Sequence, residues 1–357
     1  MKIAVLFAVI IVQLIFLYWT SFTSPFFQDD IIFLTAGNIS SLFSAIPQGV
    51  YRPVSFQLFY TVSKNFFGLN PLPFHLVLFI FFITSLVLVY RLSVKILKKD
   101  RFALSVVYFY ALNVSLFALF YWIATSYFVL GSFFIFLSLY LYLFDFPLLL
   151  SLPAFVAGLF SNEIAAVLPV LLILTSWYFK TWKKSILTFF AADAIFILLK
   201  IFVIGFPKSS SYGLKAGSFL SNFRWYFFRT LNIPEGIKRS SDSDLYTLLI
   251  LFLACILFAI YIRFKSKNIN FRLYVFAFFW FFIGALPFFF LPGHMSSFYL
   301  TVSLFGPAIF YADILSIKPK ILIAAMTVYF FLSFKGLAFL SQTHWIILKN
   351  TGPAGTP

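Results

Sequence analysis

The residues most suited to chemistry are Asp29 and Asp30, the only adjacent pair among the ten Asp and Glu residues of this 357-residue chain. The pair follows closely on a long apolar run and is flanked by Phe27 and Ile31, so its carboxylates are expected to be partly desolvated. Desolvation and like-charge repulsion both raise the pKa of one member, as a general base requires. The competing interpretation is a solvated turn or helix cap.

Glu163 is the second acidic candidate, in the tight turn Ser161-Asn162-Glu163 between two apolar runs. An ionisable group at membrane depth with no charged sequence neighbour is a functional candidate by default. The alternative is a surface carboxylate that caps the next helix. Asp193 lies inside another apolar run. It could pair with Lys200, seven residues on, or with a polar group of another helix, and a structural role is favoured.

Positive charge that could bind a phosphate group is carried by Arg224 and Arg229, which flank the aromatic run 225–228. Aromatic side chains favour the membrane interface, and the arginine fork can donate two parallel hydrogen bonds to a phosphate. The alternative is that both arginines bind anionic lipid head groups in general. The further candidate substrate-binding residues are Arg52, His75 and His294.

These patterns predict no cofactor and no metal. The three histidines are dispersed and lack the spacing of a metal site. The sequence has no glycine-rich phosphate loop and no nucleophile elbow, so nucleotide-driven chemistry is not expected. A divalent cation held by Asp29 and Asp30 together with substrate phosphates stays open.

The elements that must position these residues are membrane helices. Hydrophobic residues make up 62% of the chain and charged residues 10%, against about 25% charged in ordinary globular chains. Apolar runs of roughly 20 residues can each cross a bilayer, so an all-α polytopic fold with about eleven transmembrane helices is predicted. The expected spans are 3–20, 72–90, 102–120, 122–144, 147–161, 163–179, 185–204, 244–262, 272–291, 297–316 and 320–340.

The net charge of +16 does not indicate nucleic-acid binding, because most Lys and Arg residues lie in short loops, where they orient a membrane protein. With eleven spans, the clusters within 91–101, 180–184, 263–272 and 318–320 all fall on one side, which is the cytoplasmic side. Residues 1–357 are therefore expected to form a single multi-pass domain of the plasma membrane. Its N-terminus is cytoplasmic and its C-terminus extracytoplasmic.

Two long loops, 21–71 and 205–243, fall on the outer side and are expected to form the active-site face. The second loop is basic, against the topology rule, which suggests an anionic partner, either lipid head groups or a phosphate-bearing substrate. In the first loop, apolar residues at helical spacing predict two helices lying in the membrane interface. The two stripes consist of Ile39, Leu42, Phe43 and Ile46, and of Val54, Leu58, Val62 and Phe66, which Gly68 follows.

Several short motifs resemble those of the GT-C glycosyltransferases, above all the protein O-mannosyltransferases and related transmembrane O-mannosyltransferases. They are Asp29-Asp30 after the first span, Tyr51-Arg52-Pro53-Val54 and the stretch Phe67 to His75. Ser161-Asn162-Glu163 resembles the Lys-Glu turn of that family, and Leu286-Pro287 with 294–307 resembles its late outer turn. The likeness covers most of the chain. Two positions depart from it: Asn162 stands where lysine is frequent, and Ser297-Phe298-Tyr299-Leu300 lacks the late arginine.

The resemblance implies an active site at the outer face that takes a sugar from a polyprenyl- or dolichyl-phosphate carrier and inverts its anomeric centre. The family's catalytic acidic residue corresponds to Asp29 or Asp30. The expected partners are a polyprenyl-phosphate-linked sugar donor and membrane lipid, with the acceptor not identified. Two other classes stay open: a transporter or flippase for a lipid-linked or amphipathic substrate, and a non-catalytic scaffold in envelope assembly.

Overall fold

The computed structural model describes residues 2–36, 42, 44, 50–205, 213, 215–237, 243–267, 269–293 and 295–351. Throughout these residues the regular structure is helical, and no strand occurs. Seven of the described helices are long and apolar enough to cross a membrane. The number is eight if Asp100–Ala111 and Val114–Tyr121, which meet at 53°, form one bent span. The chain is thus an all-helical protein with the helices of a multi-pass membrane protein.

Every apolar run that was expected to cross the membrane is largely helical, and non-helical residues at 112–113 and 301–304 interrupt the runs 102–120 and 297–316. Three of these helices are shorter than the rest: Leu148–Ser161, Glu163–Phe179 and Phe305–Leu315. Length and composition alone do not assign these three to the membrane, so the count of eleven spans stays a prediction.

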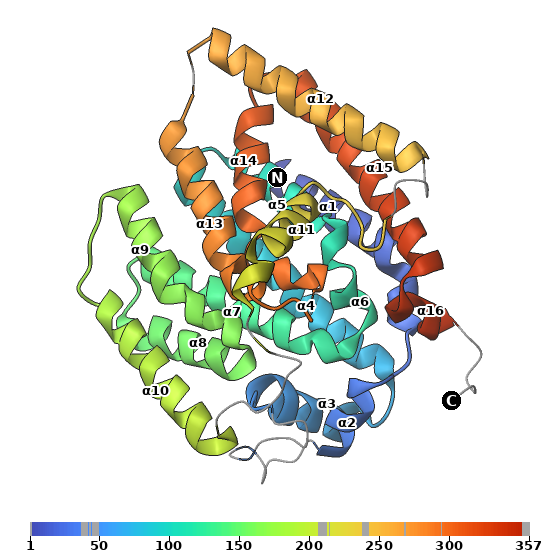
Figure 1. Ribbon diagram of the computed structural model, residues 1–357, viewed down its shortest axis with the longest axis vertical. Helices are drawn as coiled ribbons and strands as arrows, with labels where there is room; N and C mark the ends of the chain where they lie inside the picture. Colours follow the sequence, from blue (N-terminus) through green and yellow to red (C-terminus); the bar gives the residue numbers. More distant parts are fainter. Residues whose placement is uncertain are drawn as a thin grey trace. The chain divides into compact units, whose positions relative to one another are not determined.

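Contacts along the chain divide it into two compact units. Whether they act as the single domain expected for 1–357 stays a prediction. The first unit comprises 1–19, 89–121 and 216–357. Its helices are α1 (Lys2–Tyr18), α5 (Asp100–Ala111), α6 (Ala118–Tyr121), α11 (Phe219–Thr230), α12 (Ser243–Lys265), α13 (Phe271–Phe289), α14 (Phe305–Leu315), α15 (Pro319–Thr343) and α16 (Trp345–Thr351). In this unit α12 packs along α15, and α14 packs against both α5 and α13 (Figure 1).

The second unit comprises 20–88 and 122–215. Its helices are α2 (Asp29–Ala36), α3 (Phe59–Phe67), α7 (Ser126–Leu143), α8 (Leu148–Ser161), α9 (Leu168–Phe179) and α10 (Ile186–Ile204), together with most of α4 (Pro71–Leu97), which continues into the first unit. Helices α7 and α8 pack against each other, and α10 packs against α8 and α9 (Figure 1).

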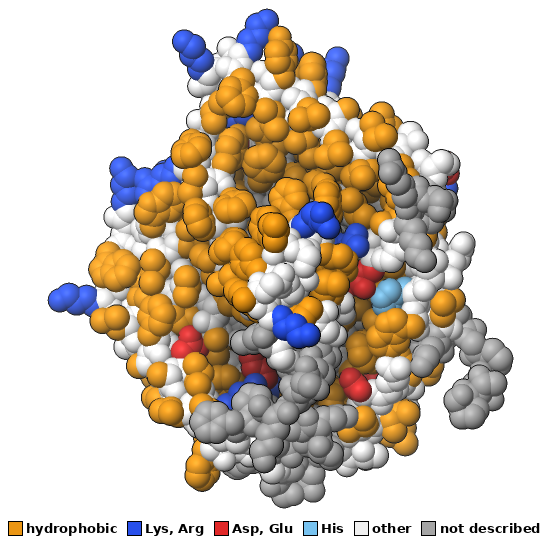
Figure 2. All heavy atoms as spheres, in the orientation of Figure 1, with side chains coloured by type: hydrophobic (Ala, Val, Ile, Leu, Met, Phe, Trp, Pro, Cys, Tyr) orange, Lys and Arg blue, Asp and Glu red, His pale blue; other side chains and the backbone are white. Residues whose placement is uncertain are grey.

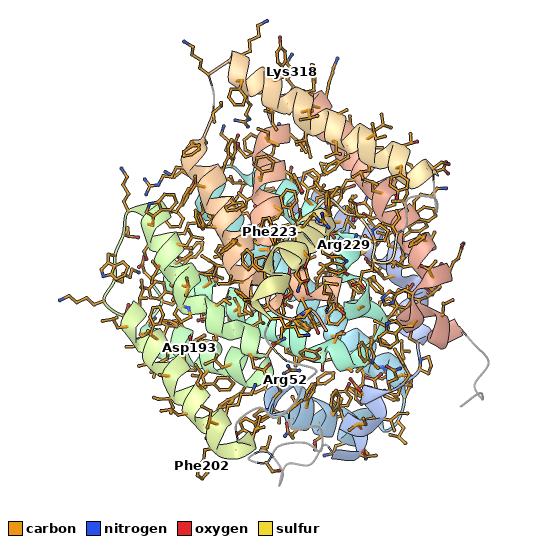
Figure 3. All side chains as sticks on the ribbon, viewed as in Figure 1. Arg52, Asp193, Phe202, Phe223, Arg229 and Lys318 are labelled. Atoms are coloured by element: carbon orange, nitrogen blue, oxygen red, sulfur yellow. The ribbon has the colours of Figure 1, made fainter. Side chains whose placement is uncertain are left out.

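Apolar side chains cover the outside of the helices as well as their packed faces. Hydrophobic side chains dominate the visible surface in Figure 2. On α10, Leu198 is 66% exposed and Phe202 89% exposed, and Figure 3 shows Phe202 pointing away from its helix. A helix that is apolar all round suits a membrane span, because lipid covers the outer face.

The predicted helix after Pro53 is confirmed. A π-helical turn at Val54–Leu58 leads into α3, which ends where Gly68 adopts a φ of +64°. The predicted stripe is the outer face: Leu58, Val62 and Phe66 are exposed, whereas Phe59 and Tyr60 are buried. Such a helix suits a membrane interface, and that location stays a prediction. The other predicted interfacial helix, 38–46, lies mostly outside the described residues.

Candidate active site

Asp30 is fully buried in the first turn of α2 and is held by three hydrogen-bond donors. The Phe27 N–H donates to Oδ2 over 3.1 Å, and the Tyr60 hydroxyl donates to Oδ1 over 2.8 Å. The backbone N–H of Ala124 is the third donor. Burial raises the pKa of Asp30 to about 7, because it outweighs the three hydrogen bonds, and the charge of Asp29 adds to it.

Asp29 differs from its neighbour in its surroundings. Its side chain is half-buried, and partial burial raises its pKa. Across the described parts of the chain, no hydrogen bond or ion pair engages its carboxylate. A base needs a free lone pair within reach of the group that it deprotonates. Of the two carboxylates, Asp29 has oxygens available for that task, whereas Asp30 is positioned to hold the start of α2.

The Glu163 carboxylate pairs with two cations. Arg52 donates from Nε over 2.8 Å and from Nη2 over 2.7 Å, both to Oε2. Lys200, on α10, donates from Nζ to Oε1. The three side chains are between 16% and 31% exposed, so the cluster is partly open. Two positive charges face one negative charge, and the cluster therefore carries a net positive charge.

Stacked aromatic rings connect this charged cluster to Asp30 within the same unit. The Arg52 guanidinium lies 4.1 Å from the Tyr127 ring centroid and 5.5 Å from that of Phe56. Phe56 stacks on Phe33 of α2 at 3.8 Å, and Phe33 meets the ring of Tyr60 edge to face. The acidic pair and the cationic cluster are thus fixed to one continuous packed core.

Buried polar contacts fix the backbone around Arg52 and Glu163. The Ser55 hydroxyl donates to the Ser161 carbonyl over 2.7 Å, and Asn162 caps the turn that carries Glu163 by accepting from the Ile164 N–H over 3.0 Å. Gly131 of α7 permits the close approach of this turn, because a Cβ there would lie 2.8 Å from the Cβ of Asn162. Asn162, where lysine was expected from the resemblance, therefore has a structural role.

His75 belongs to the same unit and is buried. Its Nε2 lies 3.0 Å from the Ser24 carbonyl oxygen, and the neighbouring Phe74 meets Phe26 edge to face at 5.0 Å. Both contacts hold the segment that precedes Asp29. Binding of substrate by His75 stays a prediction.

Other candidate residues lie elsewhere. Arg224 and Arg229 belong to the first unit, on α11 within the segment expected to be an outer loop. Arg224 is exposed and Arg229 is buried, so the two guanidinium groups have different surroundings. Their contact with the donor phosphate stays a prediction. His294 lies outside the described residues.

Of the two kinds of partner considered for Asp193, pairing with Lys200 is wrong, because Lys200 pairs with Glu163 instead. Asp193 is 9% exposed on α10, and no described residue makes a hydrogen bond to its Oδ1. Sequence reasoning also missed Tyr60. The sequence shows that Tyr60 lies on the α3 face opposite the apolar stripe, but it does not show which face is buried, and the structure places Tyr60 against Asp30.

Among the described residues, no group of three or more His, Cys, Asp or Glu side chains could hold a metal ion. The surroundings of Asp30 do not fit a cation either, because N–H and O–H donors already point at both of its oxygens.

Comparisons of the chain with models of protein families, with curated proteins and with solved structures found no match. A functional proposal therefore depends on the chemistry of the site and on the short motifs.

Proposed function

We propose that the protein is a multi-pass membrane glycosyltransferase of GT-C type, which moves a sugar from a polyprenyl-phosphate carrier to an acceptor at the extracytoplasmic face. One observation carries the proposal. A half-buried carboxylate with free oxygens, Asp29, follows a segment locked by Asp30, and the same compact unit contains a cluster with excess positive charge.

The proposed roles follow from the available oxygens of Asp29 and from the positive charge of the Arg52, Lys200 and Glu163 cluster. Asp29 takes the proton of an acceptor hydroxyl, and the oxygen attacks the anomeric carbon from the face opposite the carrier. The bond between that carbon and the phosphate oxygen breaks, and the phosphate leaves with the electron pair, so the configuration inverts. Arg52 and Lys200 supply positive charge near a leaving phosphate, and a partly desolvated cation stabilises it more than a cation in water does.

The proposed membrane arrangement has eleven spans. The three shorter apolar helices and the bent pair join the seven long helices to make up that number. The N-terminus is then cytoplasmic and the C-terminus extracytoplasmic in a plasma membrane. Helix α3, with its exposed apolar stripe, lies in the outer interface, where a carrier lipid would enter.

Substitution of the acidic pair tests the proposal. Asp29→Asn keeps the side-chain shape and removes the base, so release of polyprenyl phosphate from a panel of polyprenyl-phosphate sugars should fall by about 10²-fold or more. Asp145→Asn is the matched control, because Asp145 is an exposed carboxylate of the same unit. Full activity in Asp29→Asn, Asp30→Asn and the double variant would place the base elsewhere or exclude transfer.

A lipid-linked-substrate transporter or flippase is the second candidate, and one observation favours it. Asp193 is a buried carboxyl inside a candidate span, with one oxygen unpartnered, and ionisable groups within spans mark substrate or proton pathways in transporters. Reconstituted vesicles distinguish the two classes. A flippase moves a labelled polyprenyl-phosphate sugar across the bilayer without hydrolysis, and Asp193→Asn reduces that movement, whereas a transferase leaves its rate at the protein-free level.

A further inference from the structure

His344 lies between two helices and makes a contact through each of its ring nitrogens. It follows the last residue of α15 and directly precedes α16, which packs against α15 and α6 (Figure 1). Its Nδ1 lies 3.3 Å from the backbone nitrogen of Ile346, and its Nε2 lies 3.3 Å from Oε2 of Glu235. All of these residues belong to the first unit. The ring therefore connects the start of α16 to a carboxylate whose side chain is 12% exposed.

The two contacts require the neutral form of the imidazole. The Ile346 N–H can only donate, so Nδ1 is the acceptor and carries no proton. Nε2 then holds the single ring proton and donates it to Glu235. The first N–H groups of a helix have no partner inside the helix, and Nδ1 satisfies one of them. Because the His344 carbonyl also accepts from the N–H groups of Ile347 and Leu348, both over 3.0 Å, His344 is the N-cap of α16.

The carboxylate of Glu235 keeps its charge in mildly acidic solution. The Ser297 N–H donates to Oε1, opposite the contact of Oε2 with His344. Burial alone would raise the pKa of Glu235, but the hydrogen bonds from His344 and Ser297 outweigh burial and lower the pKa. The contact between Glu235 and His344 therefore does not depend on a neutral ring, and it becomes an ion pair when the ring gains a proton.

Among the described residues, further charged and titratable groups come from the elements around His344. Two groups on α11 interact electrostatically with Glu235. The group on α15 forms an ion pair over 2.8 Å with Asp244 of α12. Glu235 is thus the charged group that contacts the ring directly. The groups on α11, α15 and α6 are Tyr226 and Arg229, Lys335, and Tyr121, respectively.

A second proton on the ring would be bound at Nδ1 and would point at the Ile346 N–H, so the cap would be lost. The positive ring would still be paired with Glu235. A cation is favourable at the C-terminal end of a helix, here α15, and unfavourable at an N-terminal end, here α16. The state in which the first turn of α16 is open therefore binds this proton more tightly than the capped state does. It follows that a fall in pH favours opening.

We propose that His344 is a pH-sensitive latch for α16, which caps this helix when the ring is neutral and lets its first turn open when the ring is protonated. Histidine side chains change charge between about pH 8 and 5. Opening frees the side chains of Ile346 and Ile347, which are 1% and 2% exposed in the closed form. The latch goes beyond the proposed function, since neither sugar transfer nor the Asp29 carboxylate takes part in it.

Hydrogen–deuterium exchange followed by mass spectrometry on the purified full chain in detergent tests the proposal. Peptides that cover 346–348 are followed from pH 8 to 5, and each rate is divided by the intrinsic exchange rate at that pH. Protection in wild type should fall by about fivefold or more in acid, the typical effect of losing a capping residue. The start of α13 is the internal control. Its cap is Asn270, whose side chain does not titrate and accepts from the Leu273 N–H over 3.2 Å.

His344→Asn separates titration of the ring from other effects of acid. Asparagine is a good N-cap and gains no proton in this range, so the protection of α16 in this variant should be the same at pH 8 and pH 5. A wild-type protection of α16 that does not change with pH, an equal fall at the start of α13, or an undiminished fall in His344→Asn would overturn the proposal. The first two outcomes need no substitution, so they decide the matter even if the variant does not fold.

Discussion

The Tyr60 hydroxyl donates a 2.8 Å hydrogen bond to Oδ1 of Asp30, and both side chains are fully buried. The contact joins α3 to the start of α2 and turns the exposed stripe of α3 outward. It also separates the roles of two adjacent carboxylates: three donors bind Asp30, whereas no hydrogen bond or ion pair from a described residue engages Asp29.

The free energy of unfolding should fall as pH rises, because folding raises the pKa of Asp30. Its pKa of about 7 in the folded protein exceeds the unfolded value of about 3.9. The folded state therefore binds the proton more tightly, and this contribution is complete below pH ~4 and lost as pH rises through ~7. The loss amounts to at most about 4 kcal/mol. In thermal unfolding followed from pH 4 to 8, Asp30→Asn should lack this decline and Asp145→Asn should keep it. Equal slopes in wild type and Asp30→Asn would contradict the assignment.

Tyr60→Phe removes one donor from a buried carboxylate without changing the shape of the ring. The pKa of Asp30 should rise further, because the Tyr60 hydrogen bond lowers it. We expect a stability loss of about 1–3 kcal/mol at pH 8, smaller at pH 4, where the folded carboxyl is protonated. Tyr261→Phe, an exposed tyrosine, is the control. A loss that does not depend on pH would mean that only packing changed.

Glu163→Gln should leave Arg52 and Lys200 close together with no neutralising charge. The expected stability loss is about 1–3 kcal/mol, together with a smaller loss of transfer than in Asp29→Asn. Adding Lys200→Met to Glu163→Gln should recover part of that stability, because one uncompensated cation is removed. Thermal unfolding of the two single variants and the double variant measures this coupling. Strictly additive losses would show that the three side chains do not act as a unit.

Gly131→Ala should disturb the turn that carries Glu163. The added Cβ would lie 2.8 Å from the Asn162 Cβ, and overpacking of this kind costs about 1–3 kcal/mol. Gly217→Ala is the matched control, since a Cβ there meets nothing within 4 Å. An unchanged melting temperature and unchanged activity in Gly131→Ala would show that the turn yields without cost.

The proposed orientation can be read from reporter fusions. Fusions after Lys99, Lys184 and Lys267 should report the cytoplasm, because they follow the basic clusters, and a fusion after Gly68 should report the outside. A cytoplasmic signal at Gly68 would move Asp29 and Asp30 to the inner face and rule out the proposed carrier geometry.

The helices could be predicted from the sequence because each one is encoded by a long, continuous run of apolar residues. Each expected run is largely helical. The helix that ends before Gly68 was predicted from four apolar residues at helical spacing. Which face of that helix is buried was not predictable, since an apolar stripe can face either protein or lipid. Only the packed structure shows Leu58 and Phe66 outward and Tyr60 inward.

The sequence alone predicted part of the candidate site. Asp29 and Asp30 are distinctive as an adjacent pair, but their separate roles depend on Tyr60, 30 residues away, and on the Ala124 N–H. Lys200 was considered as one possible partner of Asp193 because both lie on one helix, whereas its actual partner, Glu163, comes from another element. Pairings of this kind depend on how helices pack, which no local pattern encodes.

The pairing of Lys200 with Glu163 also has a consequence for biosynthesis. A lysine in an apolar helix resists entry into the bilayer, and the chain is made from its N-terminus. Glu163 is 37 residues before Lys200 in the chain, so it has already been synthesised when α10 emerges from the ribosome. The carboxylate of Glu163 can then pair with Lys200 as α10 enters the membrane. A chain without Glu163 should therefore release α10 from the translocon more slowly.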